Sequence, residues 1–365
     1  MKTHFRVGTI LSAVLILAAT AASGQISCGA VVTSDKVMTA DLVCSGHNPA
    51  FTVQGPATVN MDGHTVTGCP ADGTGIAVVG SKGGLKNGAV IGCDQGVRIA
   101  GSGGHTVENV IVHDGGDYGF LVESANNTVI RTATFGSLGY WVNANGNKVQ
   151  RNIAVATGWG FLVTGDDGKV VGNIAAHVSN DGFAVFGSGN LLSSNKAHDC
   201  YVGFWVEGGE NRLAGNVATA SRDDGFFIYD HEAAAGSRVE RNIAVAGLKR
   251  GFELVRGTYA FGNIAAGNDG DGLNTQEEGN RLRKNKASAN GSGIAVDGPA
   301  TTVDKNLALA NLQGIAVNTS AADVSVVDNI AVGSSQDDLF DASPQCAGHV
   351  WSNNVFATGD PFCTD

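Results

Sequence analysis

The chain has 365 residues, 53 of them glycine, and carries a formal net charge of −11. This excess of carboxylates argues against nucleic acid as a partner, because binding to phosphates depends on clustered lysine and arginine. An anionic polysaccharide remains possible, but it would need a local cationic patch or a bridging cation.

Residues 1–24 have the pattern of a secretory signal peptide. The basic segment MKTHFR precedes the apolar run VGTILSAVLILAATAASG, which ends in small residues. We expect cleavage near Ala22 or Gly24. The alternative, a membrane anchor, is disfavoured because the apolar run is short for a span. The sequence therefore predicts a secreted protein, extracellular or periplasmic, without a membrane span.

Seven cysteines in a secreted chain predict disulfides. Six of them lie near the two ends of the chain, and their positions favour three local pairs: Cys28 with Cys44, Cys69 with Cys93, and Cys346 with Cys363. Cys200 is left over, and we expect it to be buried. Other pairings, or reduced thiols, are alternatives that the sequence leaves open.

The rest of the chain repeats a short unit. A glycine followed by alternating apolar residues recurs at Gly96, Gly119, Gly139, Gly160, Gly182, Gly203, Gly225, Gly251, Gly272, Gly293 and Gly314. Alternation of this kind is the period of β-strands, and turns rich in Gly, Asn and Asp separate the strands. A unit of about 21 residues is too short for a propeller blade. The repeat predicts an all-β, right-handed parallel β-helix of about 11–12 coils, roughly 50 Å long at the usual strand spacing.

A second column of the repeat consists of asparagines. They recur at Asn152, Asn173, Asn195, Asn216, Asn242, Asn263, Asn285, Asn306 and Asn329. Stacked amides can hydrogen-bond along the rod and satisfy the backbone at a tight turn. We therefore interpret this column as structural and not catalytic.

The repeat resembles that of the pectate-lyase-like β-helix superfamily over residues 70–335. MDGHTVTG (61–68) is similar to a first-coil segment of such proteins, and DLFD with WSNNVF near the C-terminus resembles a closing cap. The resemblance implies a β-helix with capped ends. We divide the chain into a signal peptide (1–24), an N-terminal cap and first coil (25–70), the β-helix (71–335) and a C-terminal cap (336–365).

Outward positions of the first strand in each unit carry unusual side chains. Alternation places the residues after Gly-Phe on the outer face, where exposed aromatics are unexpected for solubility alone. Aromatic rings flanked by carboxylates suit sugar rings, so we predict a substrate-binding face made of Trp141, Phe186, Trp205, Glu207, Phe227 and Glu253. The alternative is that a loop covers these aromatics and that they form a secondary core.

The turn before each glycine collects charged residues. Neighbouring coils place Asp181, Asp223, Asp224, Lys249 and Arg250 near one edge of the aromatic face. The segments DGFA (181–184) and DDGF (223–226) look like aspartate motifs of calcium-dependent pectate lyases. That resemblance implies Ca²⁺ at the three aspartates and a Lys249 or Arg250 base. The cofactor prediction is accordingly none or Ca²⁺.

One unit breaks the period. Its step from Gly225 to Gly251 is 26 residues, against 20 to 23 elsewhere, and it contains YDHE (229–232). This segment is similar to a stretch of mannuronan C5-epimerases, which implies that Tyr229 and His231 form an acid/base pair. The alternative is a surface loop without a function, because turns tolerate changes in length.

Together these features predict a monomeric protein that binds an acidic polysaccharide and modifies it by β-elimination or C5 epimerisation. Inverting hydrolysis is disfavoured, since it needs two carboxylates roughly 6.5–9.5 Å apart and the sequence singles out no such pair. The rival hypothesis is a non-catalytic surface or matrix protein whose outer face binds glycan or a protein partner.

Overall fold

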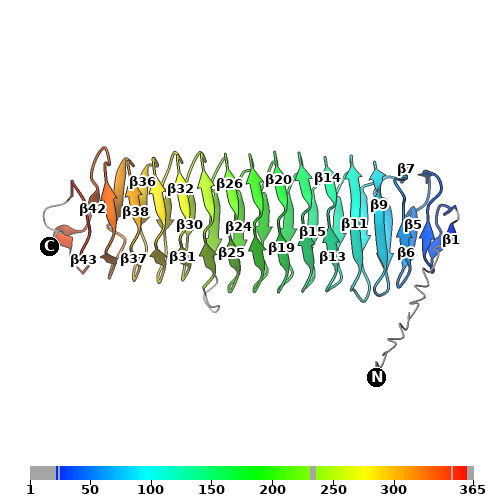
Figure 1. Cartoon of the computed structure of the whole chain (residues 1–365), viewed down its shortest axis with the longest axis horizontal. Coiled ribbons are helices and arrows are strands. Elements are labelled where there is room, and N and C mark those ends of the chain that lie inside the picture. The colour runs from blue at the N-terminus through cyan, green and yellow to red at the C-terminus, as the bar shows by residue number, and fades with distance from the viewer. Residues whose placement is uncertain (1–21, 24, 231–235, 347, 360–365) are drawn as a thin grey trace, which may run out of the picture.

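The computed structural model describes residues 22–23, 25–230, 236–346 and 348–359. Within these residues the chain winds into a long rod of stacked coils, from the blue N-terminal end to the red C-terminal end (Figure 1). Each regular coil contributes three short strands, and all strand pairs are parallel. The predicted right-handed parallel β-helix is confirmed.

One side of the rod, here called the first face, is a sheet with one strand from each coil. Its fifteen strands are β2 (Val31–Val32), β5 (Phe51–Gln54), β8 (Thr74–Val79), β10 (Gln95–Ile99), β12 (Phe120–Val122), β15 (Tyr140–Val142), β18 (Phe161–Val163), β21 (Phe183–Val185), β24 (Phe204–Glu207), β27 (Phe226–Tyr229), β30 (Phe252–Leu254), β33 (Leu273–Thr275), β36 (Ser292–Val296), β39 (Gln313–Val317) and β42 (Leu339–Asp341).

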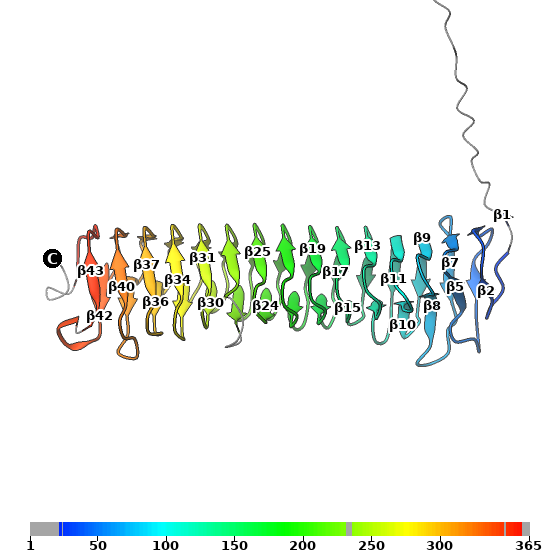
Figure 2. The same cartoon turned by 90° about the horizontal axis from the view of Figure 1, so that it is seen from below.

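The other two strands of each coil belong to a 28-stranded sheet. The strands that directly follow the first face form the second face, and from β13 on they are β13 (Thr128–Ile130), β16 (Lys148–Gln150), β19 (Lys169–Val171), β22 (Leu191–Ser193), β25 (Arg212–Ala214), β28 (Arg238–Glu240), β31 (Tyr259–Phe261), β34 (Arg281–Arg283), β37 (Thr302–Asp304), β40 (Ser325–Val327) and β43 (Val350–Ser352). Figure 2 shows several of them side by side, β25, β31 and β34 among them.

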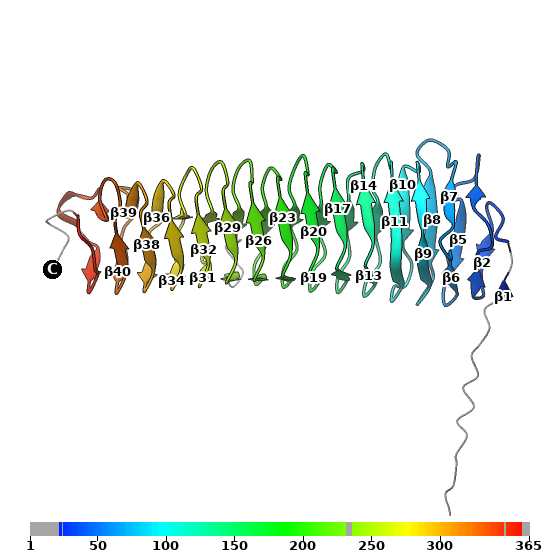
Figure 3. The same cartoon turned by 45° about the horizontal axis from the view of Figure 1, so that its top comes forward.

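The third face completes each coil and is visible in Figure 3. From β14 on its strands are β14 (Ala133–Phe135), β17 (Ile153–Val155), β20 (Ile174–Ala176), β23 (Lys196–His198), β26 (Val217–Thr219), β29 (Ile243–Val245), β32 (Ile264–Ala266), β35 (Lys286–Ser288), β38 (Leu307–Leu309) and β41 (Ile330–Val332). Strands β9 (Gly84–Ile91) and β11 (Thr106–His113) pair in both the second and the third face, which joins the two faces into one sheet.

The N-terminal coils contain the remaining strands of the 28-stranded sheet, which are β1 (Ala22–Ser23), β3 (Lys36–Val37), β4 (Leu42–Val43), β6 (Thr58–Asn60) and β7 (Thr65–Thr67). A short 3-10 helix, η1 (Pro344–Cys346), precedes β43. The rod is longer than the predicted 11–12 coils, because the fifteen first-face strands include β2, β5, β8 and β42. These four strands lie outside the glycine column from which the coils were counted.

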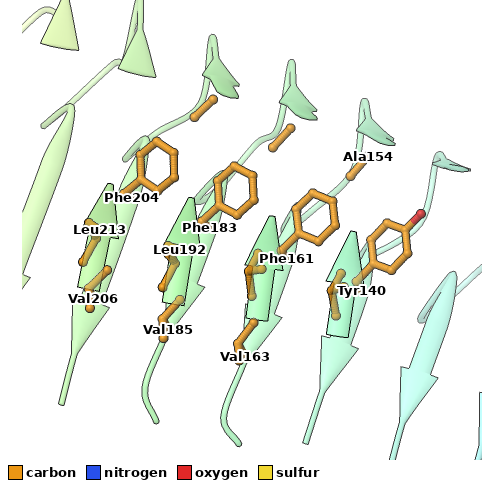
Figure 4. Close-up of a cluster of buried hydrophobic side chains, with 14 of the residues drawn as sticks. Tyr140, Ala154, Phe161, Val163, Phe183, Val185, Leu192, Phe204, Val206 and Leu213 are labelled. Carbon is orange, nitrogen blue, oxygen red and sulfur yellow. The ribbon is translucent and has the colours of Figure 1, made fainter. Parts of the chain in front are cut away.

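The core of the rod is a stack of aromatic rings. Residues in register on successive coils point inward, so the rings of Phe120, Tyr140, Phe161, Phe183, Phe204, Phe226 and Phe252 lie one above the next, four of them in Figure 4. Neighbouring centroids are 4.6 to 4.9 Å apart, close to the spacing of paired strands. The stacked rings are fully buried.

The asparagine column forms the predicted ladder. From Asn173 to Asn329, the Oδ1 atom of each asparagine in the column accepts the backbone N–H of the column asparagine one coil earlier, as Asn242 does from Asn216 at 2.8 Å. The Nδ2 group of Asn242 also donates to the carbonyl of Leu213 at 3.0 Å. Because these groups satisfy buried backbone at every turn, the column has a structural role.

The glycine column exists because neighbouring coils approach closely. A Cβ atom added at Gly225 would lie 2.7 Å from the carbonyl oxygen of Gly251 and 2.8 Å from the Cβ of Ala244. At Gly225 the requirement is therefore space between coils and not a special backbone angle. This tight stacking fixes the register in which outward side chains of successive coils meet.

Candidate functional site

The outward side of β24 and β27 carries an aromatic pair. Phe226 and Ile228 point into the core, so Phe227 and Tyr229 point out. Trp205 on β24 is the register partner of Phe227, and their ring centroids are 4.8 Å apart. Both rings are half-buried and form a continuous apolar platform on the first face.

A pocket of about 350 Å³ opens beside this platform, where the chain enters β24, β27 and β30. Its walls combine aromatic and charged side chains with Val202: Tyr201, Val202, Trp205, Asp223, Asp224, Phe227, Lys249, Arg250 and Glu253. Seven of these are residues that the sequence predicted for binding, metal coordination or catalysis. The parallel register brings them together from three successive coils.

The deepest part of the pocket is a buried ion-pair cluster. Arg250 Nε lies 3.0 Å from Asp224 Oδ1, and its Nη2 lies 2.6 Å from Glu253 Oε2. Asp224 and Glu253 are only 3% and 4% exposed. Burial, together with the adjacent Asp224 carboxylate, raises the pKa of Glu253 to about 7. A single guanidinium thus serves two carboxyl groups, and one of them titrates near neutral pH.

A second, more exposed cluster forms the rim. Lys249 Nζ lies 2.8 Å from Asp223 Oδ1, and this contact raises the pKa of Lys249. The hydroxyl of Tyr201 also donates to Asp223, which raises the pKa of Tyr201. Both groups therefore hold their protons near neutral pH. Lys249 is suited to bind an anion and less suited to act as a base.

The predicted calcium ligands do not form a ready site. Asp223 and Asp224 face Lys249 and Arg250, and Asp181 is not among the pocket residues. Burial, and next the nearby charge of Asp223, raises the pKa of Asp181 to about 6. Among the described residues no group of three His, Cys, Asp or Glu side chains is arranged to hold a metal ion. Calcium dependence therefore stays a prediction, and the described side chains do not form a calcium site.

The remaining predicted residues lie along the same face. Glu207 accepts a hydrogen bond from Trp205 Nε1 at 2.9 Å, and it is the register partner of Tyr229. Tyr229 is two residues beyond Phe227 on β27, outside the pocket itself. His231 falls outside the described residues, so its position relative to Tyr229 stays a prediction.

Trp141 and Phe186 are also on the first face but do not line the pocket. Trp141 on β15 packs against Tyr118 with ring centroids 5.0 Å apart. Phe186 follows β21 and is 44% exposed. The expectation that all outward positions face solvent is wrong at Glu253, which is buried and ion-paired with Arg250.

Sequence reasoning missed two features of the pocket. Tyr201 lies in the charged turn column, in the segment HDCYV, and its aromatic side chain was the available signal. The pairing of Asp224 with Glu253 had no such signal, because the two residues are 29 positions apart and meet only through the stacking of coils.

The predicted disulfides are partly described. Cys28–Cys44 and Cys69–Cys93 are confirmed, and Cys200 is free and buried. Cys346 is disulfide-bonded, while Cys363, its predicted partner, falls outside the described residues. In the part of the chain that the structure describes, no helix has the length and hydropathy of a membrane span.

Two family models match parts of the chain. A model of the right-handed β-helix region matches residues 137–275, and a model of the periplasmic copper-binding protein NosD matches residues 30–180. No curated protein matches this chain in sequence.

Solved structures with a similar fold include the tailspike protein of E. coli bacteriophage HK620, with 10% identity and a TM-score of 0.51, covering 89% of this chain and 69% of that one. The periplasmic alginate epimerase AlgG has 15% identity and a TM-score of 0.49, covering 84% and 78%. The A-module of the Azotobacter vinelandii mannuronan C-5 epimerase AlgE4 has 13% identity and a TM-score of 0.41, covering 79% and 88%. At 10% identity the likeness to the tailspike protein shows the fold alone.

Proposed function

We propose that this right-handed parallel β-helix protein binds an acidic polysaccharide across its first face and modifies it at a uronate residue. The observation that carries the proposal is the pocket itself. It joins the Trp205–Phe227 platform to two cationic side chains and a buried carboxyl group whose pKa is about 7. Each part has a distinct task in the chemistry of a uronate.

Binding would use the platform and the rim. The apolar C–H face of a sugar ring can lie on Trp205 and Phe227, whose rings present a half-buried surface. Lys249 stays protonated and borders the pocket, so it can receive the uronate carboxylate. Arg250 lies beside it and reinforces the positive potential at the same point.

The chemical step would be removal of the proton at C5. Glu253 in its carboxylate form takes this proton, the C5–H bond breaks, and the electron pair moves into the substrate carboxyl group. Lys249 and Arg250 stabilise the charge that develops there. A base whose pKa is about 7 is well matched to this task near neutral pH. Glu253 thereby takes over the base role that the sequence analysis gave to Lys249 or Arg250.

Two outcomes follow from the same intermediate. If the C4–O bond breaks, the electron pair forms a C4=C5 double bond and the polymer is cleaved, with Tyr201 as our candidate to donate a proton to the leaving oxygen. If a proton instead returns to C5 from the opposite side, the sugar is epimerised. Tyr229 lies further along the same face and, with His231, is our candidate for that second proton donor.

The location proposed for this activity is outside the cytoplasm, either extracellular or periplasmic. Its support is the pair of disulfides at the N-terminal end, because such bonds persist in oxidising compartments. The apolar N-terminal run and the match to a periplasmic family agree with this location.

The test is an assay on alginate and on pectate that follows both ultraviolet absorbance of unsaturated ends and NMR of sugar stereochemistry. Glu253→Gln should lower kcat by at least about 100-fold, the usual contribution of a positioned general base. The matched control is Glu123→Gln, which changes the same group in an ion pair with Arg98, 2.6 Å long and away from the pocket. Equal activity of Glu253→Gln and wild type, or no change in any polyuronate, would contradict the proposal.

Two further variants and a chelator separate the mechanisms. If Tyr229 and His231 act as an acid/base pair, Tyr229→Phe and His231→Ala should each abolish epimerisation while leaving the strand-rich circular dichroism spectrum unchanged. Loss of activity with a calcium chelator would instead favour the aspartate column. Activity that survives both substitutions and the chelator would leave Glu253 and the rim cluster as the catalytic groups.

A further inference from the structure

The second face carries a row of cations that surrounds two aromatic rings. In this row Arg212, Arg238, Tyr259 and Arg281 are register partners on successive coils. The guanidinium groups of Arg238 and Arg281 lie 5.5 and 6.0 Å from the centre of the Tyr259 ring, one on each side. The strands concerned lie side by side in Figure 2.

A second ring extends this arrangement along β31. Phe261 points outward two residues after Tyr259, with ring centroids 6.2 Å apart. The side chains of Arg241 and Lys284 each lie 5.9 Å from the centre of the Phe261 ring. Four cations therefore flank two outward aromatic rings, which is unusual on a protein whose net charge is −11.

The row borders a groove of about 490 Å³. The groove is lined by Gly236, Arg238, Gly257, Tyr259, Gly279 and Arg281. A Cβ atom added at Gly257 or Gly279 would have no neighbour closer than 3.9 Å, so the floor between the side chains is open. Both glycines have positive φ, +56° and +77°, which explains why side chains do not fill this trough.

The groove has an excess of positive charge. Glu240 pairs with Arg212 at 2.9 Å and with Arg238 at 3.3 Å. Within the described ranges, no carboxylate forms an ion pair with Arg241, Arg281 or Lys284. These cations are available to an anionic ligand.

We propose that this groove is a second, non-catalytic binding site for an acidic polysaccharide. Tyr259 offers a ring face for a sugar, Arg281 binds a carboxylate on one side of it, and Arg238, which also pairs with Glu240, binds one on the other side. The two arginines lie two coils apart, about 9.6 Å at the usual strand spacing, so they contact different sugars of one chain. The choice of a carboxylated polymer rests on the proposed function.

The position of the groove explains its use. The pocket lies where the chain enters β24, β27 and β30, whereas the groove is formed by residues that follow β27, β30 and β33. The two sites therefore lie at opposite ends of the same first-face strands. A long polymer can occupy both sites at once, whereas a short oligosaccharide can occupy the pocket alone.

The experiment measures binding and not turnover, so it can be read even if the protein modifies no polyuronate. Titration calorimetry compares wild type with the double variant Arg238→Ala/Arg281→Ala, using polymeric alginate, polygalacturonate and a uronate trisaccharide. We expect at least tenfold weaker binding of a polymer and a trisaccharide affinity within twofold of wild type. The matched control is Lys148→Ala/Lys169→Ala, which removes the same charge from the same outward row, away from the aromatic rings.

Several outcomes would overturn the proposal. These are wild-type binding of both polymers by the arginine variant, an equal loss in the lysine control, or no binding of either polymer by the wild-type protein. Equal affinity of the wild type for duplex DNA would also overturn it, because the groove would then recognise any polyanion. Absence of turnover together with selective loss of polymer binding would refute the proposed function but support the second site.

Discussion

Arg250 and Glu253 form an ion pair of 2.6 Å on the first face, and the carboxylate is almost completely buried. The two residues are three positions apart, at the turn and on the outward side of the strand that follows it. This contact holds a carboxyl group in the wall of the pocket. It also holds Arg250 in the pocket wall, whereas Lys249, which pairs with Asp223 at the rim, is more exposed to a ligand.

Arg250 should therefore matter far more for stability than Lys249. Arg250→Ala leaves Asp224 and Glu253 buried without their cation, a change that costs about 3–5 kcal/mol when a buried pair is broken. Lys249→Ala removes a contact whose lysine is half exposed, so the cost should be within about 1 kcal/mol. Urea unfolding of both variants checks this contrast. Equal losses would mean that the buried cluster does not form.

Glu253 should give the protein a characteristic pH dependence. Because the folded-state pKa of Glu253 is raised from 4.5 to about 7, the folded protein holds this proton more tightly than the unfolded chain. The resulting stabilisation is fully present below pH 4.5, declines as the pH rises to about 7, and is absent above it. Glu253→Gln should flatten this part of a plot of unfolding free energy against pH.

The same group should control the pH profile of catalysis. If the Glu253 carboxylate is the base, kcat/KM should rise as the pH passes through about 7. The useful comparison is Asp181→Asn, since the pKa of Asp181 is about 6. Removing this carboxyl group should leave the rise of kcat/KM near pH 7 unchanged. A profile that is flat between pH 5 and 8 would refute the assignment of Glu253.

Neighbouring residues on β24 should separate folding from binding. Phe204 lies in the buried ring stack, so Phe204→Ala should cost about 3–5 kcal/mol of stability. Trp205 points outward, so Trp205→Ala should weaken glycan binding about tenfold with a much smaller loss of stability. Denaturation and glycan titration of both variants test this. If Trp205→Ala unfolds the protein, the residue belongs to a covered core and the platform argument fails.

The thiol of Cys200 should be unreactive in the native protein. It is fully buried, and burial raises the pKa of its thiol to about 12. An alkylating reagent at pH 8 should label it only after denaturation. Rapid labelling of the folded protein would show that the coil around Cys200 opens. Recovery of Cys200 in a disulfide would show that the cysteine pairing is wrong.

Much of the architecture is local in origin and could be predicted. The alternation of apolar residues, the glycine at each strand entry and the recurring asparagine are properties of one repeat, and a repeat that stacks on its own copy can be extended along the chain. The residues that face outward at Trp205 and Phe227 follow from the same alternation. Coils without the glycine, such as the coil of β5, were not included in the predicted number of coils, because the repeat pattern in their sequence is weaker.

From the sequence, the charged residues of the pocket could be predicted to lie near one edge of the aromatic face, but their ion-pair partners could not be predicted. The sequence alone determined a stacked β-helix, its inward stack of Phe and Asn residues, and the outward aromatic platform, because these depend on a period of two within strands and of one coil between them. Only the tertiary structure decided that Asp224 and Arg250 bury Glu253, that Lys249 stays on the rim, and that Arg238 and Arg281 flank Tyr259. Those contacts depend on packing and ion pairing between side chains of adjacent coils, and the sequence of a single repeat does not specify them.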